Sequence, residues 1–414
     1  MNFNTKKYLH YSIQLLIIIL KMLEGLDKID WKKLEHAYGE ASDVPQLIRN
    51  LASKDINLRD QALYELYGNI FHQGTRYQAT PYAIPFIFEL IREPKVHDKA
   101  NLLKFTVDLA LGYPEAFLPK GPNVEDWAID AEQLKEEEET EGLDDIDEDW
   151  LKHIDAFIDS YKSVLKEVPT YYKFLESKDS ELKIMAIFAI AWFREVASES
   201  ANNIRPLIAK EKDELILANL LISLSMLDSY IEDKKDEQLF RNFLAENGSI
   251  LVKMSAAIAL VNILEEDVDI APLDYILKHI PSIIEFELSP FEFPWNDGEL
   301  LGFISEVIKF CAVQSPEKVI PDLSKLLSKL QGVKALNVIY SLLWIVFPEL
   351  PEQGMWTLKK LNKYQKMVLK ALAKNESLWT GEGLEASDLK NLLDEYGLPS
   401  DQKALYKLLQ LDSK

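Results

Sequence analysis

The stretch VPQLIRNLASKDINLRDQAL at residues 44–63 decides the fold, because it recurs without a gap as VPTYYKFLESKDSELKIMAI at residues 168–187. A chain with a recurring unit of this size is typically built from stacked copies of one small motif. The positions that agree between the two copies include Pro45 and Pro169, Leu51 and Leu175, Ser53 and Ser177, Asp55 and Asp179, Leu58 and Leu182, and Ala62 and Ala186.

Each copy predicts a pair of helices. In the first copy, Val44, Leu47 and Leu51 follow the spacing of one apolar helix face. Pro45 suits a first helical turn, and the segment Ser53-Lys54-Asp55 then breaks the pattern and offers capping groups to a second helix. Since each helix hides only one face, the pair must stack on neighbouring pairs. The sequence therefore predicts an all-α fold, an α-solenoid of about seven helix pairs.

The unit resembles a HEAT repeat, and the N-terminal half is similar to a bacterial group of HEAT-repeat proteins of the armadillo-like α-solenoid class. The resemblance covers roughly residues 26–207 without the acidic insert. It implies a superhelical fold and, for most such solenoids, binding of other macromolecules; it implies no reaction. The matching residues are Trp31, His36-Ala37-Tyr38-Gly39, Asp43-Val44-Pro45, His72-Gln73-Gly74-Thr75, Ala79-Thr80, and the basic residues Arg59 and Lys183.

The pattern divides the chain into five segments. Residues 1–25 are expected to be an extension outside the native fold, with a capping helix or a weak membrane anchor as alternatives. Repeats follow at 26–120 and 151–350, and a helical cap closes the chain at 351–414. Later helices are expected at 204–209, 213–227, 239–244, 250–264, 272–280, 298–311, 319–330 and 333–346.

The segment between the two sets of repeats, residues 121–150, carries 14 acidic residues and one lysine. A charge run of this kind is typical of a solvated loop. The alternative is an acidic decoy for a basic partner. The whole chain has a formal net charge of −22, which repels phosphate backbones and favours basic proteins. The single cysteine, Cys311, lies in an apolar helical pattern, where a buried, unreactive thiol is expected in a reducing cytoplasm.

The first candidate site is the connection His72-Gln73-Gly74-Thr75, which combines polar side chains with a flexible glycine. Loops carry binding and catalytic groups more often than cores do. The alternative is that these side chains fix a non-helical connection by capping and hydrogen bonding. The residues expected to converge on this site are His36, Tyr38, His72, Gln73, Thr75, Arg76 and Tyr77.

A second candidate is the proline-rich loop SPFEFPWNDG at residues 289–298, with Phe291, Phe293 and Trp295 among acidic residues. Exposed aromatic residues with a polar rim are typical of protein-binding hot spots. The alternative is that the loop folds back and buries its aromatic side chains.

Motifs for specific chemistry are absent. The six histidines are scattered, and the sequence has no HExxH, GxSxG, GxxxxGK[ST] or GxGxxG pattern. No catalytic residue, metal or cofactor is therefore predicted. Lysines and arginines form no basic stripe, so nucleic acid is not expected as a partner. No membrane association is expected either, unless residues 1–21 act as an anchor.

The sequence leads to one main hypothesis and two alternatives. The main one is a cytoplasmic, non-catalytic protein-binding module or scaffold for a basic partner such as a toxin. The second is an enzyme on a HEAT-like scaffold, of the lyase or DNA-glycosylase type, in which His72, His36 and nearby carboxylates meet in a compact pocket. The third is a purely structural scaffold. The oligomeric state is left open.

Overall fold

The computed structural model describes residues 23–118, 120–140, 145–231, 235–312, 315–349, 356–380 and 384–411. The all-α prediction is confirmed: within these ranges the chain is helical except for connections and two hairpins of two-residue strands. Of the extension predicted at residues 1–25, residues 1–22 lie outside the described part of the chain.

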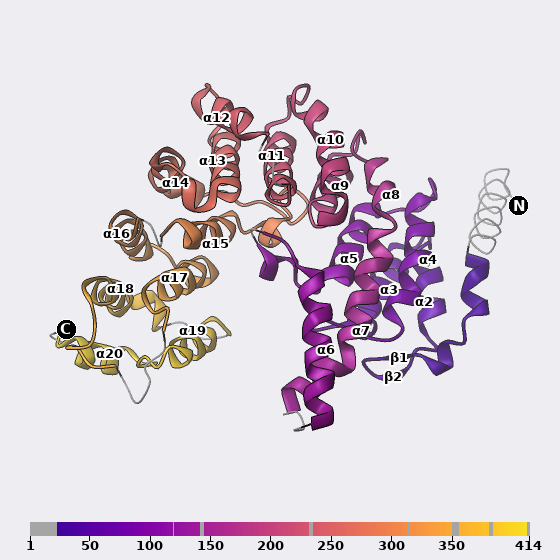
Figure 1. Ribbon diagram of the computed structural model, residues 1–414, viewed down its shortest axis with the longest axis horizontal. Helices are drawn as coiled ribbons and strands as arrows, with labels where there is room; N and C mark the ends of the chain where they lie inside the picture. Colours follow the sequence, from indigo (N-terminus) through magenta and orange to yellow (C-terminus); the bar gives the residue numbers. More distant parts are fainter. Residues whose placement is uncertain are drawn as a thin grey trace, which may run out of the picture. The chain divides into compact units, whose positions relative to one another are not determined.

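The chain divides into two compact units (Figure 1). The first unit comprises Met1–Phe117 and Gly121–Asn203, and the second comprises Leu118–Lys120 and Ile204–Lys414. The segment boundaries predicted at 120, 150 and 350 are therefore not the boundary between these two units.

The first unit begins with two short 3-10 helices and then alternates helices with hairpins. Its elements are η1 (Leu23–Lys28), η2 (Trp31–Lys33), β1 (Glu35–His36), β2 (Gly39–Glu40), α2 (Val44–Asn50), α3 (Ile56–Asn69), β3 (Phe71–His72), β4 (Thr75–Arg76), α4 (Thr80–Arg92), α5 (Lys99–Leu111), η3 (Pro114–Phe117), α6 (Val124–Thr140), α7 (Asp145–Leu165), α8 (Val168–Tyr172), α9 (Ser180–Ile190) and η4 (Arg194–Val196). Helix α10 (Ala197–Ile208) crosses into the second unit. Within the first unit, α2 packs on α3, α4 on α5, and α5 on α9.

The recurring stretch forms a short helix, a turn and a second helix in both places. Asp55 precedes α3, and its side chain accepts a 3.0 Å hydrogen bond from the backbone N–H of Asn57; Asp179 precedes α9 and accepts a 3.1 Å bond from the N–H of Leu182. Two residues earlier in each copy, Ser53 or Ser177 accepts a 3.1 Å bond from the N–H of that aspartate. The two copies therefore share one turn that starts the second helix of each pair.

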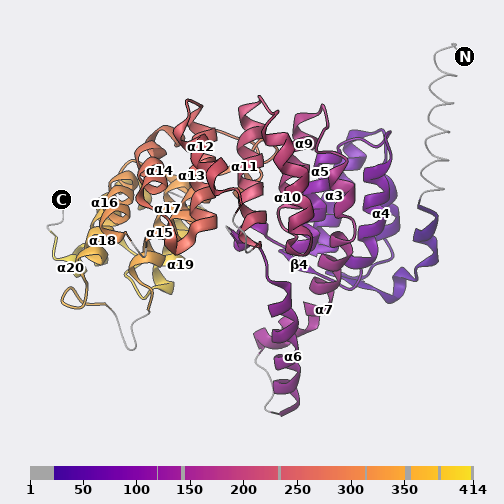
Figure 2. The same cartoon turned by 45° about the horizontal axis from the view of Figure 1, so that its top comes forward.

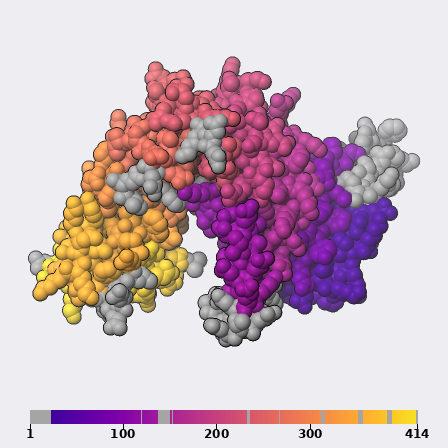
Figure 3. Space-filling model, in the orientation of Figure 1, coloured from indigo at the N-terminus to yellow at the C-terminus, as the bar shows by residue number. Residues whose placement is uncertain are grey.

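The acidic insert is helical, which corrects the loop expected at 121–150. Helix α6 packs against α7, and the two extend beyond the other helices of the first unit in both views (Figures 1 and 2). Their shared core holds Ala131, Ile154 and Ile158, with Trp127 packed against it. The carboxylates of Glu125, Asp126, Asp130, Glu132 and Glu136 are exposed, and the surface of α6 is open to view in Figure 3.

The second unit is a series of packed helices. Its elements are α11 (Glu214–Ser229), α12 (Glu237–Ala245), α13 (Ile250–Leu264), η5 (Glu265–Asp267), α14 (Ile270–Ile283), η6 (Trp295–Gly298), α15 (Leu300–Ala312), α16 (Pro316–Leu327), α17 (Gly332–Val346), α18 (Lys363–Lys374), η7 (Glu376–Leu378), α19 (Leu384–Glu395) and α20 (Gln402–Leu409). Helix α13 lies against α11, α12, α14 and α15. Its residues 254–264 are all buried, as the apolar pattern of this helix predicts.

Two further expectations concern the second unit and the membrane. Cys311 is buried at the end of α15, as predicted, and burial raises the pKa of its thiol to about 12. Among the described residues, no helix combines the length and the apolar character needed to cross a membrane.

Candidate functional site

Two small β-hairpins organise the candidate site in the first unit. Strands β1 and β2 are antiparallel, with His36 opposite Gly39, and β3 and β4 are antiparallel, with His72 opposite Thr75. The first hairpin is attached to the end of α3 through the backbone N–H of Ala37, which donates a 3.1 Å hydrogen bond to the carbonyl of Asn69. This backbone bond holds together two segments that are 32 residues apart in sequence.

The turn of the second hairpin requires a glycine. Gln73 and Gly74 have φ angles of 49° and 83°, which is the left-handed pair of a type I′ turn. A Cβ atom on Gly74 would lie 2.6 Å from the ring of Tyr113, so this ring packs directly on the turn. Gly74 is therefore fixed by its backbone angles and by its contact with Tyr113.

The hairpins and the end of α3 enclose a hollow of about 580 Å³. Three of its tyrosines are strongly exposed: Tyr38 at 72%, Tyr64 at 80% and Tyr113 at 50%. We call this site the tyrosine hollow. Its lining residues are His36, Tyr38, Asp43, Tyr64, Glu65, Tyr67, Gly68, Asn69, His72, Gln73 and Tyr113. Its volume is in the range of ordinary ligand sites.

His36 and Asp43 hold the first hairpin in place. Nε2 of His36 lies 3.0 Å from Oδ1 of Asp43, and Nδ1 accepts a 3.0 Å hydrogen bond from the backbone N–H of Tyr38. Because Nδ1 accepts, Nε2 carries the proton and donates to the carboxylate. Oδ2 of Asp43 accepts a 2.9 Å bond from the side-chain amide of Asn69. Both ring nitrogens of His36 thus serve the hairpin, which is the structural alternative expected for this residue.

His72 is placed differently. Its Nδ1 lies 3.1 Å from the carbonyl oxygen of Gly68, and a carbonyl can only accept, so Nδ1 carries the proton. In the neutral ring this leaves a lone pair on Nε2. The ring packs edge to face with Tyr38, with 5.6 Å between the centroids. His72 therefore brings an oriented acceptor to the wall of the hollow.

A buried polar network lies behind Tyr67. The Tyr67 hydroxyl donates a 2.5 Å hydrogen bond to Oδ2 of Asp108, and Nζ of Lys104 lies 3.1 Å from the same oxygen. Asp108 is almost fully buried, so the lysine compensates its charge within α5. The network fixes Tyr67 and leaves the three exposed tyrosines as the accessible rings.

Three residues predicted for the site lie outside the hollow. Arg76 is buried; its guanidinium stacks 4.0 Å from the ring centroid of Phe157 and donates to the carbonyl of Gly74, and burial lowers its pKa to about 9. Tyr77 packs edge to face with His153 at 4.9 Å, and Thr75 pairs with His72 in the hairpin. Arg76 and Tyr77 therefore attach the hairpin to α7.

The sequence prediction missed several lining residues, above all Tyr64, Glu65 and Tyr113. Tyr64 and Glu65 lie on α3 outside its apolar stripe, and an exposed tyrosine in the polar face of a predicted helix was the available signal. Tyr113 follows Gly112 at the end of α5, and no sequence pattern links it to Gly74, 39 residues earlier.

The second predicted site is not exposed, which corrects the hot spot expected at Phe293 and Trp295. Both side chains are fully buried, and Phe291 is half-buried. Nε1 of Trp295 donates a 2.8 Å hydrogen bond to Oδ1 of Asn219 on α11. The loop folds back on the second unit because burying two large aromatic side chains is favourable once the indole N–H has a partner.

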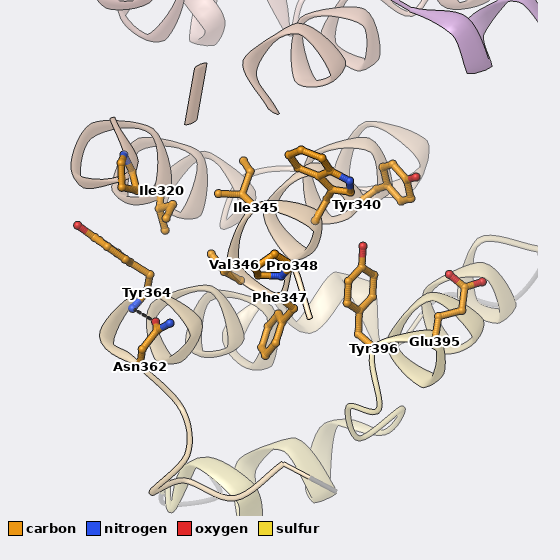
Figure 4. A pocket seen from close by; sticks show the side chains of 12 residues that line it. Ile320, Tyr340, Ile345, Val346, Phe347, Pro348, Asn362, Tyr364, Glu395 and Tyr396 are labelled. Carbon is orange, nitrogen blue, oxygen red and sulfur yellow. Dashed lines mark hydrogen bonds between the residues drawn. The ribbon is translucent and has the colours of Figure 1, made fainter. Parts of the chain in front are cut away.

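The second unit carries an apolar groove of about 670 Å³ that the sequence did not reveal (Figure 4). Tyr364 lies at one end of the groove, and Tyr396 lies at the other with Glu395. Tyr340 and Trp344 are partly exposed on α17, and the buried Nζ of Lys309 lies over both rings at 4.6 and 5.6 Å. The i, i+4 spacing of these two aromatic residues was the only sequence signal.

Another buried polar group lies between α10 and α12. Arg205 donates a 3.0 Å hydrogen bond to Oδ1 of Asp228 and a 2.8 Å bond to Oδ2 of Asp236. Asp228 is fully buried, and burial, together with the charge of Asp236, raises its pKa to about 7. Two carboxylates thus share one arginine.

The chain matches no protein-family model and no curated protein. Among the described residues, no group of three histidine, cysteine, aspartate or glutamate side chains is arranged to hold a metal ion. The chemistry of the tyrosine hollow consists of aromatic faces, two carboxylates, amide groups and one oriented imidazole.

Proposed function

We propose that the chain is a cytoplasmic, non-catalytic protein-binding module of the HEAT-repeat type, an α-solenoid that engages a basic protein partner. The matched turns at Asp55 and Asp179 support repeats of one unit, and the net charge of −22 supports a basic partner. A basic toxin that the chain neutralises is one such partner.

The observation that carries the proposal is the exposure of Tyr38, Tyr64 and Tyr113 around one hollow. Single exposed apolar residues are common on protein surfaces, but three large aromatic side chains around a concave site are a feature of binding surfaces. Tyrosine is enriched in the residues that dominate binding energy, because it buries a large area with few rotatable bonds.

The acidic surface would act mainly on the rate of association. Opposite charges steer two proteins toward each other, and salt screens this effect beyond about 10 Å at 0.1 M ionic strength. The exposed carboxylates of α6 belong to this surface. Association should therefore slow as salt is raised, while contacts in the tyrosine hollow should govern the rate of dissociation.

The test is affinity capture by the full chain from cell lysate at low and moderate salt, with three baits. These are the unchanged chain, Tyr38→Ala, and Tyr82→Ala as the matched control. Tyr82 is an exposed tyrosine on α4 that does not line the hollow. A basic protein captured by the unchanged chain and by Tyr82→Ala, but lost with Tyr38→Ala, supports the proposal. Equal capture by the unchanged chain and by Tyr38→Ala contradicts the proposal, and so does a failure to capture any basic protein.

A second candidate function is an enzyme of the lyase or DNA-glycosylase type, and the orientation of His72 favours it. His72 and His36 line one hollow with Asp43 and Glu65, as the enzyme hypothesis requires. The lone pair of Nε2 could take a proton from substrate or water. The described lining residues include no serine, threonine, cysteine or lysine, so a covalent mechanism has no nucleophile of those types there.

The two candidates differ in what His72→Gln does. Glutamine keeps a side-chain N–H for the Gly68 carbonyl but cannot act as a base at neutral pH. Loss of turnover of a small molecule identified in native mass spectrometry, with partner capture unchanged, would favour the enzyme. If His72→Gln changed neither turnover nor partner capture, the binding module would remain the supported function.

A further inference from the structure

We propose that the tyrosine hollow binds the side chain of an arginine presented by the partner protein. This inference rests on the proposed function and adds the chemistry of the group that is recognised.

The charge of the hollow favours a cation. Its described lining contains the carboxylates of Asp43 and Glu65 and no lysine or arginine. Asp43 accepts one hydrogen bond at each oxygen, from His36 and Asn69, and Glu65 accepts one from Gln61 at 2.8 Å. A carboxylate offers about four lone-pair sites, so both retain acceptor capacity for a further donor.

The exposed tyrosine rings can attract a cation. A cation is attracted to the face of a tyrosine ring within about 6 Å of its centroid. The comparison with the groove of the second unit is informative, because there Lys309 lies over Tyr340 and Trp344. Within the described part of the chain, no lysine or arginine lies over Tyr38, Tyr64 or Tyr113. The groove supplies its own cation, whereas the hollow has aromatic faces to offer to an external one.

Arg76 is the cation closest to the hollow along the hairpin, and it does not fill this role. Its guanidinium stacks on Phe157 and donates to the carbonyl of Gly74, on the side of the hairpin that meets α7. It is not among the lining residues and is almost fully buried. Its positive charge opposes part of the attraction that the carboxylates of Asp43 and Glu65 exert on a cation.

An arginine side chain fits this lining better than a lysine side chain. A guanidinium is planar, so it can stack on a tyrosine ring while its edge donates several hydrogen bonds. The hollow offers acceptors of three kinds for such an edge: the Glu65 carboxylate, the Gln73 amide and Nε2 of His72. An ammonium group is more strongly hydrated and makes no planar stack, so it should bind more weakly.

The experiment is ligand-observed NMR titration of the full chain with N-acetyl-Gly-Arg-Gly-amide. Three comparison peptides replace the arginine with citrulline, lysine or phenylalanine; citrulline keeps the shape of arginine without its charge. We expect a Kd on the order of 1 mM for the arginine peptide, weaker binding of the lysine peptide, and at least tenfold weaker binding of the citrulline and phenylalanine peptides.

Variants locate the binding. Tyr38→Ala should weaken the arginine peptide about fivefold, and Tyr38→Phe should restore most of that loss because the aromatic face remains. Glu65→Gln should weaken the affinity for the arginine peptide about threefold, and it should reduce the ratio of this affinity to that for the citrulline peptide. Tyr82→Ala, on α4 outside the hollow, should change nothing. Circular dichroism of each variant checks that the helices are retained.

Equal binding of arginine and citrulline peptides would overturn the inference in favour of a neutral polar ligand. Preference for phenylalanine would overturn it in favour of an apolar one, and arginine binding that ignores Tyr38 and Glu65 would place the cation elsewhere. The proposed function would fail in a different way, because capture of a basic protein that does not depend on Tyr38 contradicts that function whatever the peptides show. Capture that depends on Tyr38 but not on Glu65, together with no binding of the arginine peptide, would retain the binding module and reject the arginine.

Discussion

Trp295 and Asn219 are fully buried and joined by a 2.8 Å hydrogen bond from the indole N–H to the amide oxygen, across 76 residues of sequence. The amide nitrogen of Asn219 donates in turn to the carbonyls of Leu215 and Glu292, at 2.8 and 2.9 Å. One asparagine on α11 therefore satisfies both the side chain and the backbone of the proline-rich loop, which explains why this loop is folded back rather than exposed.

Replacing Asn219 with alanine should destabilise the chain by about 3 kcal/mol, because it leaves the indole N–H and a carbonyl buried without partners. The measurement is the free energy of unfolding in urea. Asn242→Ala is the control, since Asn242 is exposed and makes only an exposed bond with Gln238. Its expected effect is within about 0.5 kcal/mol. Equal losses in the two variants would mean that Asn219 does not hold the loop.

The two histidines of the tyrosine hollow should differ in their effect on stability. His36→Ala removes a buried ring with bonds to Asp43 and Tyr38 and should cost about 2 kcal/mol. His72→Ala removes one bond from a half-buried ring and should cost less than about 1 kcal/mol. Urea unfolding of both variants measures the difference. A larger loss at His72 would contradict the roles assigned here.

Two glycines in the same region should respond in opposite directions to alanine. Gly74→Ala adds a Cβ at a φ of 83° and within 2.6 Å of the Tyr113 ring, and should destabilise by about 2 kcal/mol. Gly68→Ala lies in α3 with no atom near its Cβ position and should stabilise by about 0.5–1 kcal/mol. The change in melting temperature gives the sign of each effect. A higher melting temperature for Gly74→Ala would contradict the packing of the Gln73-Gly74 turn against Tyr113.

Stability should fall with rising pH because of Asp228. Burial raises its pKa to about 7, so between about pH 4 and 7 the native state holds a proton that the unfolded chain has lost. This contribution is complete below about pH 4 and is lost as the pH passes the native value. The side chain in Asp228→Asn cannot titrate. The free energy of unfolding of this variant, relative to that of the unchanged chain, should therefore rise by on the order of 3 kcal/mol between pH 5 and pH 8. Urea unfolding at several pH values measures both free energies; if Asp228 were already ionised at pH 5, the two plots of free energy against pH would run parallel.

Cys311 should be unreactive in the folded chain. Its side chain is buried, and its pKa of about 12 leaves almost no thiolate at pH 8. Labelling with Ellman's reagent should modify it at least a hundredfold more slowly in buffer than in 6 M guanidinium chloride. Fast labelling of the native chain would show that the end of α15 opens readily.

Local signals in the sequence were sufficient for the starts of α3 and α9 and for the whole of α13. The pattern Ser-Lys-Asp before an apolar period predicted the starts of α3 and α9, because the capping bonds involve residues only two or three positions apart. Helix α13 was predicted at its observed bounds because a long apolar run has little alternative to a buried helix. Whether the helix pairs stack into a solenoid stays a prediction.

The acidic helices and the hairpins were not predictable in the same way. The charge run concealed the helical spacing of Trp127 and Ala131, which pack on Ile154 and Ile158 of α7. Strands of two residues are too short to show an alternating pattern. The sequence did place His36, Tyr38, His72 and Gln73 in one neighbourhood, and these four line one hollow. Tyr64 and Tyr113 reach it only through tertiary packing.

The shared turn of the two repeats has a consequence for how such a chain can change length. In each copy of the recurring stretch, a serine and an aspartate form a complete helix start whose hydrogen-bond partners lie within that copy; they are Ser53 with Asp55 and Ser177 with Asp179. A duplicated helix pair would bring its own helix start with it, and a deleted helix pair would leave the helix starts of its neighbours intact. The gene could therefore lengthen or shorten by whole units without inventing a new junction, and the recurrence 124 residues downstream is the kind of record that such duplication leaves.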